Sequence, residues 1–383
     1  MITAMLPAAL RPLFAMGPPN PAAVEDFLAR SRFPLVHGTS CTFVWHGEAD
    51  AVSLKHWIFG LPQKQSFHRI EGADLWYLQL ELPPQSRIEY KLEVVNGDEA
   101  VWIEDPLNPQ RARDPYGANS VAYGEGYETP EWTQPNSESR PGTLEEVWRP
   151  SPALERDARL TVYLPARFRR TRKYPLLIVH DGHDFLEYAS LRTVLDNLIH
   201  RLEIPEMVVA LTDPGQRLLE YANFAPHARF IADELVPWLE SRFPLTGRPA
   251  DRCLMGASMG AVAALSTAVR YPDRFGRLLL ESGSFAFTDI GESPRRGPIE
   301  SVVGFVNAFR ERPRKVAERA FVSCGRYESL IVENRSLVPT LQSAGMEVRY
   351  VEARDGHNWE NWRDRLRDGL TWLYPGPMWM VYE

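Results

Sequence analysis

The sequence is poor in cysteine, with only three in 383 residues. These are Cys41, Cys253 and Cys324, which are widely separated and lie in apolar stretches. An odd number of isolated cysteines does not form a disulfide framework, so we expect buried, reduced thiols and a cytoplasmic protein. Residues 1–16 carry no basic segment ahead of their apolar part, which argues against a secretory signal.

Other features are also missing. No apolar run is long enough to cross a bilayer, which excludes a membrane-spanning protein. The formal net charge is -7, and the short basic run at 167–173 does not offset it, so nucleic acid is not an expected partner. The sequence has no glycine-rich phosphate loop and no pair of histidines at helical ligand spacing. We therefore expect neither a cofactor nor a metal.

The first part of the chain alternates short β-rich runs with turn residues. Asn96 and Gly97 form a hairpin signal between two of these runs. We predict a small antiparallel β-sandwich, followed by a linker rich in Pro, Ser, Gly and Glu at 124–142, with the N-terminal domain at 1–145. The predicted strands are 41–45, 51–57, 75–82, 87–95 and 100–103.

Beyond residue 145 strands alternate with helices, which predicts an α/β catalytic domain at 146–383 with a mostly parallel sheet and helices on both faces. In such sheets functional groups collect at the carboxyl ends of the strands. A polar excursion at 287–298 interrupts the alternation. The predicted strands are 159–163, 176–180, 207–211, 252–255, 277–280, 320–323 and 347–351. The predicted helices are 190–200, 224–243, 259–271, 299–309, 333–345 and 359–373.

The segment 256–260 has the sequence GASMG and lies between a predicted strand and a predicted helix. In this setting the G-x-S-x-G pattern predicts a sharp turn that exposes a nucleophilic serine, here Ser258. Glycines must flank the serine because the strand and the helix leave no room for side chains. The backbone amide of Met259 then points to the place where a negative oxygen would develop. The pattern indicates acyl transfer.

A serine hydroxyl needs a base, and His357 is the best placed of the nine histidines. It follows a predicted strand and precedes the last helix, so it lies at the carboxyl edge of the sheet. Two others, His180 and His183, lie at another strand end beside the predicted oxyanion loop. For His180 and His183 we expect a structural or substrate-contact role.

The imidazole needs a carboxylate partner that fixes its tautomer. Glu328 follows the strand 320–323 and gives the chain order serine, acid, histidine that this fold uses. Glu281 and Asp213 also end strands next to the nucleophile and remain alternatives. The second oxyanion donor is expected in the loop after 176–180, from the amide of His183 or, close behind, of Gly182.

From about residue 159 to residue 373 the chain resembles the esterase D-like branch of the α/β-hydrolases, most closely the enterochelin (ferric enterobactin) esterases. The segments that carry the resemblance are 174–182 (YPLLIVHDG), 256–265 (GASMGAVAAL), 271–276 (YPDRFG), 281–285 (ESGSF) and 355–362 (DGHNWENW). The segment 324–330 resembles the acid-bearing loop of feruloyl esterases, with glutamate in place of aspartate. At the N-terminus, 105–109 (DPLNP) and 117–120 (GANS) resemble the immunoglobulin-like domain that precedes the hydrolase in enterochelin esterases.

The resemblance implies a serine esterase that hydrolyses a macrocyclic catecholate siderophore in the cytoplasm and releases its iron. Such a substrate is strongly anionic, so Arg217 and Arg326, on loops at predicted strand ends, are candidate substrate contacts. A feruloyl or acetyl carbohydrate esterase is the alternative enzyme, and a non-catalytic glycan-binding protein is a third interpretation. The expected partner is a small-molecule ester, and the sequence gives no oligomeric state.

Overall fold

The computed structural model describes residues 6–14, 19–287 and 297–377. The chain divides into two compact units. The first contains Met1–Glu128 and two short segments from later in the chain, Arg326–Ser329 and Ala353–Gly356. The second contains Thr129–Gly325, Leu330–Glu352 and His357–Glu383. Most of the predicted excursion at 287–298 lies outside the described residues.

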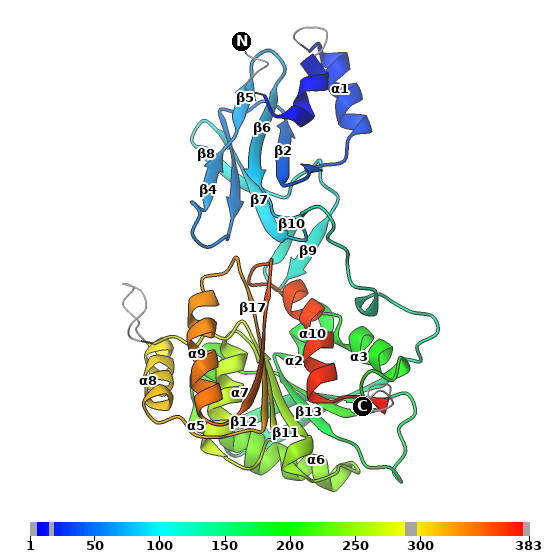
Figure 1. Cartoon of the computed structure of the whole chain (residues 1–383), viewed down its shortest axis with the longest axis vertical. Helices are drawn as coiled ribbons and strands as arrows, with labels where there is room; N and C mark the ends of the chain where they lie inside the picture. The colour runs from blue at the N-terminus through cyan, green and yellow to red at the C-terminus, as the bar shows by residue number, and fades with distance from the viewer. Residues whose placement is uncertain (1–5, 15–18, 288–296, 378–383) are drawn as a thin grey trace. The chain divides into compact units, whose positions relative to one another are not determined.

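The first unit is built on two antiparallel sheets, with strand orders β1-β2-β6-β5 and β4-β3-β7-β10-β9, and with β8 paired to β7 (Figure 1). Two helical segments precede them, the 3-10 helix η2 (Ala8–Phe14) and α1 (Pro21–Arg30). The strands are β1 (Leu35–His37), β2 (Ser40–His46), β3 (Ala51–His56), β4 (Lys64–Ser66), β5 (His68–Ile70), β6 (Leu75–Glu81), β7 (Arg87–Asn96), β8 (Glu99–Ile103), β9 (Arg111–Asp114) and β10 (Gly117–Tyr123).

Alternating side chains from both sheets bury a shared apolar core. Phe43 of β2 and Tyr90 of β7 meet edge to face in it, with ring centroids 4.9 Å apart. The Asn96-Gly97 hairpin is confirmed, since β7 and β8 pair through Asn96 and Glu99 and Gly97 has a φ of 57°. The five predicted strands are all present. The short strands β1, β4, β5 and β9, together with β10, η2 and α1, were missed.

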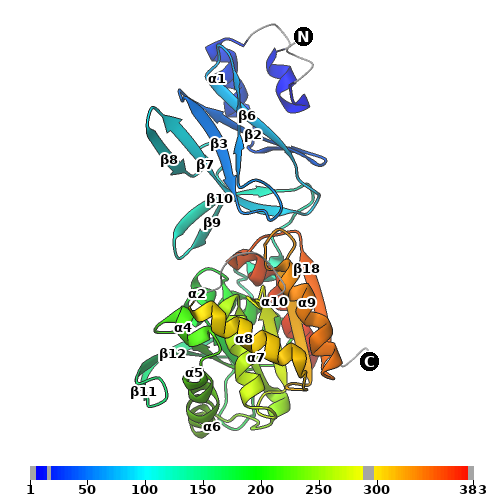
Figure 2. The ribbon, with the colours of Figure 1, turned by 90° about the vertical axis from the view of Figure 1, so that its left-hand side faces the viewer.

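The second unit contains an eight-stranded sheet of order β11-β12-β14-β13-β15-β16-β17-β18. β11 and β12 are antiparallel, whereas the strands from β14 to β17 in this order pair in parallel. β11 begins before the predicted boundary at residue 145 and was missed; Figure 2 shows it with β12 at one edge of the sheet. The strands are β11 (Thr143–Ser151), β12 (Arg156–Leu164), β13 (Leu176–His180), β14 (Val208–Thr212), β15 (Arg252–Ala257), β16 (Arg277–Glu281), β17 (Arg319–Gly325) and β18 (Glu347–Ala353).

Helices cover both faces of this sheet, as predicted. Every residue of β13 is buried because successive side chains enter two different cores: the core that contains Leu176 also contains residues of α7, α8 and α9, and the core that contains Leu177 also contains residues of α3 and α10. Figures 1 and 2 show these two groups of helices on opposite faces of the sheet. The helices are α2 (Gly182–Glu187), α3 (Leu191–His200), α4 (Arg217–Tyr221), α5 (Ala225–Arg229), α6 (Val236–Arg242), α7 (Met259–Arg270), α8 (Pro298–Glu311), α9 (Ile331–Ser343), α10 (Trp359–Leu373), the short 3-10 turns η3 (Glu131–Thr133) and η5 (Pro249–Asp251), and the π-helix η4 (Phe230–Leu235).

The long helix predicted at 224–243 is divided into α5, the π-helical η4 and α6. Pro226 lies in the first turn of α5, where a missing amide costs little, whereas Pro237 closely follows the π-helical η4 in backbone that is already helical. All three cysteines are buried thiols that form no disulfide among the described residues, as expected. Among the described residues, no helix combines the length and the apolar character needed to traverse a bilayer.

Candidate active site

Ser258 lies at the turn between β15 and α7, as the sequence predicts. Its φ of 57° and ψ of -123° are strained values for a residue with a side chain. The turn is tight: a Cβ on Gly256 would lie 2.3 Å from the carbonyl carbon and oxygen of Gly260. Only glycine fits there, which explains the first glycine of the motif.

The backbone around Ser258 is fixed by the segment that follows β16. The Ser258 amide donates to the carbonyl oxygen of Glu281 at 2.9 Å, and the Ser284 amide donates to the Ser258 carbonyl oxygen at 3.1 Å. The Ser284 hydroxyl lies 3.2 Å from the Ser258 hydroxyl oxygen. Sequence reasoning missed Ser284, although its position just beyond β16, the strand beside β15, was an available signal.

His357 lies between β18 and α10 and is exposed. Its ring meets Trp362 edge to face, with centroids 5.1 Å apart, and the Trp362 indole N–H donates to the Ser282 hydroxyl at 2.9 Å. Trp362 therefore links His357 to the segment 281–284, which also contacts Ser258.

The three candidate acids lie in different environments. Glu328 is 3% exposed and belongs to the short segment 326–329 of the first unit. Asp213, just after β14, accepts the backbone N–H of His183 at 2.9 Å, and burial raises the pKa of Asp213. Its carboxylate is thus engaged in holding the loop after β13.

Glu281, at the end of β16, is completely buried. Burial raises the pKa of its carboxyl well above the ordinary value, and the charge of Arg365 and the Ser323 hydroxyl lower it by less. Because a raised pKa favours the protonated form, such a carboxyl is a poor anionic partner for an imidazolium. This environment argues against Glu281 as the acid of the site.

The raised pKa of Glu281 predicts a pH-dependent stability. Its contribution is complete below the unfolded-state pKa, ordinarily 4.5, and is lost as the pH rises through the folded-state pKa. As the pH rises above the unfolded-state pKa, the free energy of unfolding should fall by at most about 1.4 kcal/mol per pH unit on this account, and Glu281→Gln should remove that fall. Urea unfolding at a series of pH values measures it, with the exposed Glu311→Gln as control. Parallel curves for Glu281→Gln and wild type would contradict the assignment.

The loop after β13 carries the predicted oxyanion donors. Gly182 begins α2, where the first amides have no acceptor within the helix, and a Cβ on Gly182 would lie 2.3 Å from that of Leu211. The His183 amide, which the sequence favours as the second donor, already donates to Asp213. The structure therefore favours Gly182 over His183.

Asp181, the residue before this loop, has a left-handed φ of 55°. Its carboxylate pairs with both Nε and Nη2 of Arg217, at 2.9 and 2.8 Å, and its amide donates to the Tyr221 hydroxyl at 3.0 Å. Arg217 is a predicted substrate contact, but this bidentate pair compensates its charge within the protein. Arg326, the other predicted contact, is exposed.

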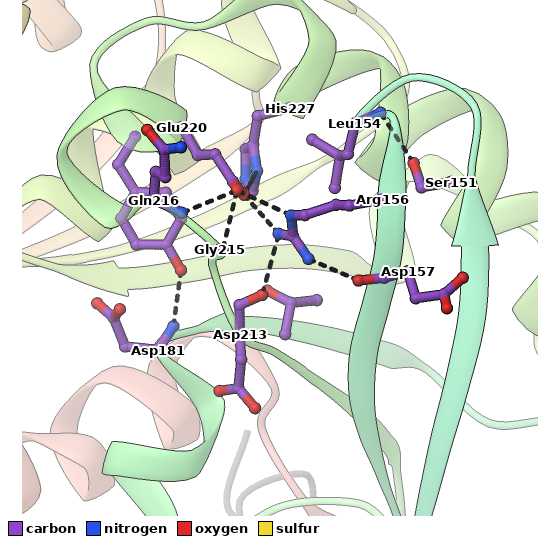
Figure 3. A network of polar contacts seen from close by, with 12 residues as sticks. Ser151, Leu154, Arg156, Asp157, Asp181, Asp213, Gly215, Gln216, Glu220 and His227 are labelled. Atoms are coloured by element: carbon purple, nitrogen blue, oxygen red, sulfur yellow. Dashed lines mark hydrogen bonds and ion pairs between the residues drawn. The ribbon is translucent and has the colours of Figure 1, made fainter.

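Glu220 organises the loop after β14 that carries Asp213 (Figure 3). Its carboxylate accepts two hydrogen bonds from Arg156, at 3.0 and 2.7 Å, and the amides of Gly215 and Gln216. Against the effect of burial, His227 and Arg156 lower the pKa of Glu220 to about 2. The charged carboxylate of Glu220 thus fixes the loop whose Asp213 accepts the His183 amide at the start of α2.

His180, at the end of β13, is fully buried beside His227. Its Nδ1 lies 2.8 Å from the carbonyl oxygen of Met255. Burial first, and then the charge of His227, lowers the pKa of His180 to about 3, so its ring is neutral at ordinary pH. Of the two expected roles for His180, the structural one fits this position.

Comparison with known proteins identifies the family. The family described as "Esterase: Putative esterase" matches residues 151–373. The iron(III) enterobactin esterase of Escherichia coli K12 is 24% identical over 340 residues, which cover 82% of each chain. The uncharacterized protein YjcH of Bacillus subtilis is 32% identical over 148 residues, which cover 37% of this chain and 62% of that protein. The crystal structure of the Shigella flexneri enterobactin esterase, determined in the presence of enterobactin, superposes with a TM-score of 0.73 at 22% identity and covers 94% of this chain and 99% of that one. The chain therefore belongs to the putative esterase family, as an enterochelin esterase-like member, and is a carboxylic ester hydrolase.

Proposed function

We propose that the chain is a serine esterase in which Ser258 is the nucleophile, His357 the base and Glu328 the acid that orients the imidazole. The observation that carries the proposal is the strained backbone of Ser258 at the β15–α7 turn, because strain of this kind persists where it serves a function. The contact of Ser258 with the segment 281–284, to which Trp362 links His357, supports it.

The proposed reaction has two halves. His357 takes the proton of the Ser258 hydroxyl while its oxygen attacks the ester carbonyl carbon, and the imidazolium then gives that proton to the departing alkoxide. In the second half, His357 deprotonates a water molecule that attacks the acyl-enzyme, and the proton returns to Ser258. The products are one carboxylic acid and one alcohol for each bond cleaved.

Both tetrahedral intermediates carry a negative oxygen that needs backbone donors. We assign these to the amides of Met259, the first residue of α7, and Gly182, the first residue of α2. The Ser284 hydroxyl, 3.2 Å from that of Ser258, holds the nucleophile's oxygen before attack.

We further propose that the substrate is a catecholate siderophore ester, hydrolysed in the cytoplasm to release iron, and that the first unit is an immunoglobulin-like domain. Relatives named as enterobactin esterases match 82% of the chain, which is more than the second unit alone contains, and this supports both proposals. Arg326 is exposed and is proposed to contact the anionic substrate.

A comparison of three esters tests the substrate. The purified chain is incubated with ferric enterobactin, methyl ferulate and p-nitrophenyl acetate, and kcat/KM is measured for each. We expect kcat/KM for ferric enterobactin to exceed that for methyl ferulate by about 10-fold or more, because a site built for the triester rejects a smaller ester. A preference for methyl ferulate would overturn the siderophore proposal in favour of a carbohydrate esterase. Absence of turnover with all three would overturn the esterase proposal itself.

A further inference from the structure

The first unit contains two segments that are far from the β-sandwich in sequence. Residues 326–329 follow β17 and include Glu328, and residues 353–356 end immediately before His357. The two segments are joined to each other by backbone hydrogen bonds, from the Arg326 amide to the Ala353 carbonyl oxygen at 2.7 Å and from the Tyr327 amide to the Asp355 carbonyl oxygen at 3.0 Å.

Arg87, the first residue of β7, binds the second of these segments. Its side chain is completely buried, with Nη1 3.2 Å from the Asp355 carboxylate and Nη2 2.9 Å from that of Glu89. Its amide also donates to the Arg354 carbonyl oxygen at 2.9 Å. A buried guanidinium is costly to desolvate, so its place between two carboxylates is strongly determined.

The Asp355 carboxylate connects Arg87 to the backbone that precedes His357. The same oxygen that accepts Arg87 also accepts the backbone N–H of Gly356 at 2.7 Å. Gly356 is the residue before His357. Arg87 and the backbone that leads into the base are thus linked through a single carboxylate oxygen.

Tyr327 fixes the other segment in the same way. Its hydroxyl lies 2.5 Å from the Ser86 hydroxyl, and its carbonyl oxygen accepts the Phe59 amide at 2.7 Å. Its ring packs against the apolar core of the β-sandwich. Tyr327 is the residue before Glu328, so β-sandwich residues restrain the backbone on which the acid stands.

We propose that Arg87 and Tyr327 are positioning residues for catalysis, through which the β-sandwich sets the places of Glu328 and His357. The proposal rests on the proposed function, which assigns those two residues to the catalytic site. Displacement of a catalytic group by about 1 Å lowers turnover by up to about 100-fold without weakening substrate binding equally. The contribution of the β-sandwich would then be to kcat, in addition to any contact with substrate.

The test compares Arg87→Met and Tyr327→Phe with wild type, using p-nitrophenyl acetate and a fluorophosphonate probe. Arg69→Met, an exposed arginine of the same unit paired with Asp74, and Tyr116→Phe, at an exposed turn, are the matched controls. We expect kcat and the labelling rate to fall about 10–100-fold for Arg87→Met and about 3–10-fold for Tyr327→Phe, with KM changed less than about threefold. Arg87→Lys should recover part of the loss. The controls should match wild type.

Circular dichroism at the assay temperature shows whether each variant is folded. If Arg87→Met does not fold, the test relies on Tyr327→Phe, which lacks only a single oxygen atom. Values of kcat within about twofold of wild type in folded variants would overturn the positioning role and leave the proposed function intact. A rise in KM of the size expected for the fall in kcat, with kcat itself unchanged, would also overturn the positioning role. A wild-type chain with no turnover and no labelling would overturn the proposed function, and the positioning role with it.

Discussion

Replacement of Ser258 by alanine is expected to lower kcat for p-nitrophenyl acetate by about 10^4-fold or more and to abolish covalent labelling by a fluorophosphonate. The variant keeps the turn, because alanine occupies the same space without the attacking oxygen. A residual rate above that in water would reflect the backbone donors alone. Initial rates and gel fluorescence of the labelled protein measure both effects.

The control for this prediction is Ser241→Ala, which removes an exposed hydroxyl that donates only to the Trp238 carbonyl oxygen among its described contacts. It should behave as wild type. Peptide mapping of the labelled wild-type chain should place the adduct on Ser258. An adduct on the neighbouring Ser284, or full turnover by Ser258→Ala, would show that the nucleophile is misassigned.

Glu328→Gln is expected to lower kcat by about 10^2- to 10^4-fold, with KM nearly unchanged. An amide has nearly the shape of the carboxyl group but cannot stabilise the imidazolium as an anion, and it favours the wrong tautomer of the histidine. Steady-state kinetics of folded protein measure the change. Because Glu328 is buried, the thermal unfolding temperature must be recorded alongside.

Glu281→Gln is the matched comparison, since it makes the same chemical change in a second buried carboxyl that ends a strand next to the nucleophile. It should retain kcat within about threefold at neutral pH, because burial raises the pKa of Glu281 and so already disfavours its charged form. The reverse pattern, with Glu281→Gln inactive and Glu328→Gln active, would transfer the acid role to Glu281.

The sequence predicted those parts of the site that depend on local pattern. The GASMG turn was recognisable because its glycines satisfy a steric requirement between neighbouring elements, β15 and α7. His357 was recognisable because strand and helix periodicity placed it at the carboxyl edge of the sheet. The alternation of apolar strands and amphipathic helices likewise predicted the sheet and the helices on both of its faces.

Interactions between distant segments could not be predicted. Nothing near Arg217 in sequence shows that its charge is used by Asp181, and nothing near His183 shows that its amide is bound to Asp213. Strand β11 was missed because its residues are largely polar and exposed, so it lacks an apolar pattern. Ser284 is an intermediate case: its position just beyond a predicted strand was visible in the sequence, but its contact with Ser258 depends on the pairing of β16 with β15.

The discontinuous first unit limits how this protein can be divided by truncation or proteolysis. The polypeptide passes between the two units after residues 128, 325, 329, 352 and 356. A single cut in the segment 129–142 would therefore separate Met1–Glu128 from the segments 326–329 and 353–356, so each fragment would carry part of the first unit. A shortened chain that starts at Thr143 would retain Tyr327 and Asp355 but lack Ser86 and Arg87. It would therefore lose the contacts made by the residues that precede the proposed acid, Glu328, and the proposed base, His357.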